Sequence, residues 1–131
     1  MKKTGILHPE LMRVIASMDH TDRLVIADSG LPIPPSVLRI DLALSSGVPS
    51  FAQTLGAVLH ELQVESATVA EEMRQRSPAL YQATRQLLGA TPLQHITHEQ
   101  FKAALLQVRA VVRTGEQTPY ANIILQSGVT F

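Results

Sequence analysis

The stretch MDHTDRLVIADSG, residues 18–30, contains the clearest strand signal in the chain. Its polar first part includes His20, the apolar run 24–27 follows, and a carboxylate, Asp28, comes directly after that run. A short, continuous apolar run between turn residues is typical of a buried strand. The stretch therefore predicts a strand over 23–27, with a histidine at its beginning and an acid at its end.

Helix-like and strand-like segments alternate through the rest of the chain. Pro9 suits a first helical position, Ser77 a helix N-cap, and Thr97 with Gln100 matches a capping box. Helices are expected over 9–18, 50–62, 77–88 and 97–108, and further strands over 38–44, 66–70, 92–96, 110–114 and 122–126. This alternation predicts a single α/β domain over residues 1–131, with three layers (α/β/α) and a mixed, mostly buried sheet of about six strands.

The composition argues against several function classes. Lysine plus arginine equals aspartate plus glutamate at 11 each, so the chain lacks the basic excess of a nucleic-acid or membrane-surface protein. With no cysteine, disulfides and thiolate chemistry are excluded. No apolar run approaches the ~20 residues of a membrane span or forms a signal peptide. We therefore expect a soluble cytoplasmic protein with no nucleic-acid partner and no membrane association.

His20 and Asp28 each have an ordinary and a functional interpretation. In open α/β sheets, ligands gather beyond the carboxyl ends of the strands, which is where Asp28 is expected. An aspartate two residues before Gly30 also commonly caps a turn. His20 either interacts with the end of a helix or transfers protons near neutral pH. Spacing alone leaves both pairs of alternatives open.

The remaining polar candidates lie in the second half of the chain. His98 and Lys102 are four residues apart and share one face of a predicted helix. His95 is three residues from His98, but a helix begins between them, so no metal site is predicted. The turn-rich segment 113–122 presents Tyr120 and Asn122, whose side chains donate and accept hydrogen bonds as a polyhydroxylated ligand requires. For residues of these types in such positions, a surface role is the more common case, and the sequence pattern alone favours it.

Taken in order, these segments resemble the D-ribose pyranase and L-fucose mutarotase family. The resemblance covers nearly the whole chain and is most specific in three motifs: HTD at 20–22, ADSGLP at 27–32 and TPYANIIL at 118–125. The length of the chain is closer to that of members of the ribose branch than to that of members of the fucose branch. One departure lies beside His20, where the family pattern usually has glycine and this chain has Asp19. A positive φ at that position would be tolerated by aspartate better than by most residues.

The resemblance implies an isomerase that exchanges the pyranose and furanose rings of D-ribose without a cofactor. It implies a homo-oligomer, expected to be a decamer of two stacked pentameric rings, with sites at subunit boundaries. A fucose-type mutarotase and a non-catalytic sugar-binding module are the alternatives. The implied catalytic residue is His20, and the implied sugar-binding residues are Asp28, His98, Lys102, Tyr120, Ala121 and Asn122.

Overall fold

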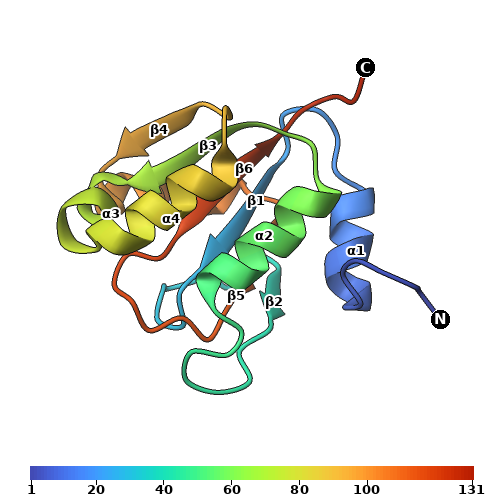
Figure 1. Cartoon of the computed structure of the whole chain (residues 1–131), viewed down its shortest axis with the longest axis horizontal. Helices are drawn as coiled ribbons and strands as arrows, with labels where there is room; N and C mark the ends of the chain where they lie inside the picture. Colours follow the sequence, from blue (N-terminus) through green and yellow to red (C-terminus); the bar gives the residue numbers. More distant parts are fainter.

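The computed structural model describes residues 1–131 and contains one mixed sheet (Figure 1). Its strands are β1 (Arg23–Ala27), β2 (Arg39–Asp41), β3 (Val64–Ala70), β4 (Leu93–Ile96), β5 (Ala110–Arg113) and β6 (Ile123–Ser127). Their order across the sheet is β2-β5-β1-β6-β3-β4. Strand β6 runs antiparallel to both of its neighbours, and the other strands run parallel to one another. The expected six-stranded mixed sheet is therefore confirmed.

Helices cover both faces of this sheet. The helices are α1 (Pro9–Ala16), α2 (Phe51–Glu61), α3 (Glu71–Arg76), α4 (Pro78–Leu88), α5 (His98–Ala104) and the 3₁₀ turn η1 (Leu105–Gln107). Figure 1 shows α1, α2 and α4 on the face of the sheet toward the viewer. The larger core lies between these helices and the sheet, and it includes Leu11, Phe51 and Tyr81. The smaller core, with Phe101 and Leu105, fills the opposite face, which confirms the three-layer α/β/α arrangement.

The central strand β1 matches its predicted bounds, and residues 24–27 are fully buried. Alternate residues face the two cores: Leu24 and Ile26 pack in the larger one, Val25 and Ala27 in the smaller one. A strand buried on both faces has no polar side to display, which explains its continuous apolar run. Its two ends therefore set the positions of His20 and Asp28.

Several boundaries differ from the sequence prediction. The strand expected over 38–44 is shortened to β2. The Asp41 carboxylate accepts a hydrogen bond from the Ala43 N–H, and this turn ends the extended run. The short helix α3 was not predicted. The capping box of Thr97 and Gln100 is confirmed. Ser77 precedes α4 as expected, but its hydroxyl donates to the Pro119 carbonyl instead of capping the helix.

None of the helices combines the length and the apolar character needed to cross a membrane.

Candidate functional site

The sheet topology brings segments far apart in the chain to one edge of the sheet. Strand β1 ends before Asp28, β4 ends before His98, and the antiparallel strand β6 begins after Tyr120 and Asn122. We call this the carboxyl edge, because β1 and the strands parallel to it end here. The opposite edge, where β1 begins, is the amino edge. Four of the predicted sugar-binding residues therefore lie at the carboxyl edge, as the rule for open α/β sheets expects.

A cavity of about 450 Å³ opens at the carboxyl edge, and we call it the Asp28 cavity. It is lined by Asp28, Gly30, Leu31, Pro32, Arg76, His98, Pro119 and Tyr120. Carboxylate, imidazole, phenol and guanidinium groups together offer both hydrogen-bond donors and acceptors. The cavity can therefore accommodate a small polar ligand.

Asp28 is held in place by two neighbours. Its side-chain oxygen Oδ1 accepts from the Gly30 N–H at 2.9 Å, so the turn-capping interpretation is correct. Its other oxygen accepts from Asn122 Nδ2 at 3.0 Å, and Asn122 Oδ1 accepts from the Asp28 N–H at 2.9 Å. Asn122 is fully buried, which makes this reciprocal pair a rigid support. The same carboxylate thus caps a turn and lines the cavity.

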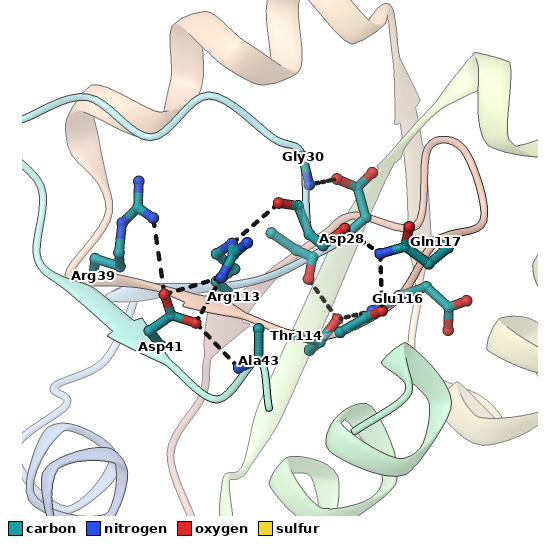
Figure 2. A network of polar contacts seen from close by, with 12 residues as sticks. Asp28, Gly30, Arg39, Asp41, Ala43, Arg113, Thr114, Glu116 and Gln117 are labelled. Atoms are coloured by element: carbon teal, nitrogen blue, oxygen red, sulfur yellow. Dashed lines mark hydrogen bonds and ion pairs between the residues drawn. The ribbon is translucent and has the colours of Figure 1, made fainter. Parts of the chain in front are cut away.

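The loop after Asp28 is anchored by a wider polar network (Figure 2). Arg113 donates from Nε to the Ser29 carbonyl at 3.0 Å and from Nη1 to both oxygens of Asp41 at 3.0 and 3.1 Å. Burial tends to raise the pKa of Asp41, but hydrogen bonds from the Ala43 N–H and from Arg113 outweigh it and lower that pKa. The buried Thr114 hydroxyl donates to the Ala27 carbonyl at 2.7 Å. These contacts fix the backbone on both sides of Asp28.

Glu116 connects this network to the larger helical layer. One carboxylate oxygen accepts from the Phe51 N–H at the start of α2, at 2.9 Å, and the other accepts from the Thr118 hydroxyl at 2.9 Å. Burial tends to raise the pKa of Glu116, while the hydrogen bonds from Phe51 and Thr118 lower it more. The charged form of Glu116 therefore stabilises the loop that leads to Tyr120.

His98 and Tyr120 meet edge to face, with ring centroids 5.1 Å apart and an interplanar angle of 83°. The His98 N–H donates to both carboxylate oxygens of Glu72, each at 3.1 Å, which fixes the start of α5. Its ring nitrogen Nδ1 is buried without a hydrogen-bond partner. Tyr120 has φ of 63°, an unusual value for a residue with a large side chain. Unpaired buried groups and strained backbone concentrate at functional sites.

Three predicted binding residues, Asn122, Lys102 and Ala121, do not line the cavity. Lys102 Nζ pairs with Glu99 Oε1 at 2.7 Å on α5, and Lys102 is not among the lining residues. Ala121 is fully buried, so its backbone rather than its side chain is available to the site. His95 pairs with the Tyr81 hydroxyl at 2.8 Å and not with His98. No group of three potential metal ligands converges anywhere in the structure.

His20 lies at the amino edge, away from the Asp28 cavity. Strand β1 separates the two, and its five residues span about 16 Å. The His20 side chain is 52% exposed, and its Nε2 lies 2.9 Å from Glu65 Oε2. Asp19, which stands where the family pattern usually has glycine, does not have a positive φ. The positive φ in this loop occurs at Thr21 (72°). A single copy of the chain therefore does not bring His20 to the predicted binding residues.

The full-length comparisons identify relatives of this fold and site. The model of the RbsD / FucU transport protein family matches residues 1–130. The chain belongs to this family. Proteins named D-ribose pyranase from Geobacillus kaustophilus and Laribacter hongkongensis are 54% and 53% identical over all of this chain, covering 96% and 100% of their own lengths. The structure of Bacillus subtilis RbsD complexed with D-ribose has a TM-score of 0.97 and 43% identity, with both chains fully covered. FucU from Bifidobacterium longum has a TM-score of 0.79 and 26% identity, covering 95% of this chain and 97% of its own.

Sequence reasoning missed two charged residues that this RbsD/FucU-type structure places beside candidate groups. Arg76 reaches the cavity from the end of α3, a helix that was not predicted. Glu65 contacts His20 from the start of β3, 45 residues along the chain. Neither position carries a local motif, because only the sheet topology brings these side chains to the groups they meet.

Proposed function

We propose that this chain is an isomerase that interconverts the pyranose and furanose ring forms of D-ribose. The observation that carries this proposal is identity of more than half over the full length to proteins named D-ribose pyranase. The polar Asp28 cavity supports it, because a sugar needs donors and acceptors arranged around a small volume. The close structural likeness to RbsD complexed with D-ribose supports the same substrate class.

The reaction consists of proton transfers around one hemiacetal. Ring opening requires the anomeric hydroxyl to lose a proton and the ring oxygen to gain one, and reclosure uses a different hydroxyl. Electron transfer and phosphate activation have no part in these steps, so the chemistry requires no cofactor. Imidazole titrates near neutral pH, which suits His20 as the general acid and base. Such catalysis contributes roughly 10²- to 10⁴-fold.

The binding roles follow from the chemistry of each group at the carboxyl edge. In this proposal Asp28, Lys102 and Asn122 hold sugar hydroxyls, Asp28 with the strong bonds that a carboxylate accepts. Tyr120 and the Ala121 backbone position the sugar beside them. His98, with its unpaired Nδ1, binds the sugar or takes part in the second proton transfer.

We further propose that each site is completed by His20 from a second copy of the chain. The separation of His20 from the Asp28 cavity along β1 supports a shared site, because general acid–base catalysis requires hydrogen-bond reach. Exposed apolar side chains at Leu7, Leu44 and Val48, beside an apolar groove of about 410 Å³, fit burial against another copy. The family resemblance supplies the expected assembly, a homodecamer of two pentameric rings.

The cytoplasm is the proposed location, since ring exchange serves an imported sugar before its phosphorylation.

Saturation-transfer NMR on D-ribose tests the function directly. We expect the protein to accelerate exchange between pyranose and furanose signals. L-fucose provides the comparison, because a fucose-type mutarotase accelerates exchange between anomers of that sugar without changing ring size. Faster exchange on L-fucose than on D-ribose would favour the mutarotase. Ribose binding without accelerated exchange would favour a non-catalytic module.

A further inference from the structure

Both oxygens of the Glu65 carboxylate are engaged at the amino edge. Oε2 lies 2.9 Å from His20 Nε2, and Oε1 accepts from Gln126 Nε2 at 2.7 Å. The hydrogen bonds from Gln126 and His20 lower the pKa of Glu65. Gln126, Glu65 and His20 therefore form a chain of side chains that ends on the imidazole.

The backbone places Glu65 for this contact. Val64 pairs with Ser127 and Ser66 pairs with Gln126, so the ladder shifts register between them and Glu65 has no opposite residue. Such a β-bulge redirects a side chain and is over-represented beside active sites. Gly128 packs against the same residue: a β-carbon at Gly128 would lie 3.0 Å from Glu65 Cβ.

The His20 loop is fixed independently of its side chain. The Thr21 N–H donates to the Ser127 carbonyl at 2.9 Å, and the Ser127 N–H donates to the Asp22 carbonyl at 2.8 Å. Figure 1 shows this loop, between α1 and β1, beside the end of β6. Asp22 pairs with Arg109, and neither Asp19 nor Asp22 is a hydrogen-bond or ion-pair partner of His20. Glu65 is therefore the single charged group that forms a hydrogen bond or ion pair with the imidazole.

We propose that Glu65 is a positioning residue for His20, which accepts the Nε2–H and leaves Nδ1 as the nitrogen that exchanges a proton with the sugar. This inference rests on the proposed function. Nδ1 takes the proton of the anomeric hydroxyl, and the freed electron pair forms the carbonyl. The bond between the anomeric carbon and the ring oxygen breaks, and the ring oxygen receives the proton held on Nδ1. Proton and electron pairs balance, and reclosure through another hydroxyl reverses the same steps.

The kinetic test compares Glu65→Ala and Glu65→Gln with wild type in ribose exchange. We expect Glu65→Ala to lower kcat roughly tenfold to hundredfold, because His20 loses its hydrogen bond to a charged carboxylate. KM should stay nearly unchanged, because Glu65 does not contact the sugar in this proposal. Glu65→Gln keeps an acceptor oxygen and should lose roughly half as much on a logarithmic scale. The matched control is Glu71→Gln, which neutralises an acid paired with Arg74 away from His20 and should leave kcat unchanged.

The spectroscopic test uses protein labelled with ¹⁵N at histidine and needs no activity. We expect His20 to carry its proton on Nε2 with a downfield Hε2 signal, and we expect this signal to move upfield in Glu65→Ala. A wild-type His20 protonated on Nδ1, an unchanged Hε2 signal, or a kcat within twofold of wild type in Glu65→Ala would overturn the proposal. If wild type showed no ribose exchange, the proposed function would fail, while the NMR result would still report on Glu65. If Glu65→Ala folds poorly, both tests are carried out with the more conservative Glu65→Gln variant.

Discussion

At the carboxyl edge of the sheet, Asp28 is fixed by Gly30 and by the buried Asn122, whereas at the amino edge His20 has one side-chain partner, Glu65, and is half exposed. The supports around Asp28 extend through Arg113 and Thr114 into the sheet (Figure 2). The His20 loop is tied mainly through its backbone.

This difference matches the tasks proposed for the two edges. Groups that bind a sugar gain from being held rigidly, because less freedom is lost when the ligand arrives. A group that completes the site of another copy must instead be accessible before assembly. The comparison therefore predicts that substitutions at the amino edge affect turnover, while those at the carboxyl edge affect binding and stability together.

The largest effect is expected at His20. His20→Ala should remove acceleration of ribose exchange, a loss of roughly 10²- to 10⁴-fold, because the proposed general acid and base is gone. Exchange measured by NMR beside circular dichroism separates chemistry from folding. His60→Ala is the matched control, because His60 is exposed on α2 and makes no side-chain hydrogen bond. A folded His20→Ala protein with near-normal exchange would refute the assignment.

Asp28→Asn should weaken ribose binding by roughly tenfold to hundredfold, because a charged hydrogen-bond acceptor is lost. Its effect on the free energy of unfolding should be smaller, because asparagine keeps the shape and its one amide oxygen can still cap the turn, while the bond from Asn122 Nδ2 is lost. Calorimetric titration with ribose and thermal melting measure the two effects. Unchanged ribose affinity with a large fall in Tm would instead show that Asp28 caps the turn and does not bind the sugar.

Thr114→Val should sharpen the contrast in stability between the edges. It removes a hydroxyl that donates to the buried Ala27 carbonyl and accepts from the Glu116 N–H, while the Ala27 carbonyl still accepts from the Thr114 N–H. Two hydrogen bonds are lost, each worth about 0.5–1.5 kcal/mol, so the free energy of unfolding should fall by about 1–3 kcal/mol. Glu65→Gln, on the exposed amino edge, should change that free energy by less than about 0.5 kcal/mol. Chemical denaturation of both variants measures the difference, and equal effects would contradict the comparison.

The smallest effect concerns pH. The pKa of Glu116 is lowered in the folded protein, so its contribution to stability is fully present above its usual pKa of 4.5. That contribution is lost as the pH falls through the lower, folded-state value. Wild type should therefore lose more unfolding free energy on acidification than Glu116→Gln, which has no charge to lose. Parallel pH dependences of the two proteins would show that Glu116 does not contribute in this way.

Much of this fold could be predicted because its signals are local. The apolar run 24–27 and the capping box at Thr97 depend on neighbouring residues only, and both predictions hold. Strand β2 was predicted too long, because the Asp41 side chain ends it. Helix α3 was not predicted, because it depends on the burial of Met73. These are tertiary effects that no short stretch displays.

In the candidate site too, some residues could be placed from the sequence and others could not. Asp28 could be placed at the carboxyl edge because the end of its strand can be read from the sequence, whereas His98 and Tyr120 were assigned to the site by the family resemblance. Arg76 and Glu65 could not, since their positions depend on an unpredicted helix and on a β-bulge. The separation of His20 from the cavity also follows only from the length and direction of β1.

The shared site is the central claim, and complementation between two inactive variants tests it most directly. His20→Ala and Asp28→Ala proteins are dissociated, mixed in equal amounts and reassembled, and ribose exchange is measured after light scattering confirms the assembly. If each site takes His20 from one copy and Asp28 from another, random mixing should restore about a quarter of wild-type activity. If both groups served the same site from one chain, every site would lack one of them, and a mixture no more active than its two components would contradict the account.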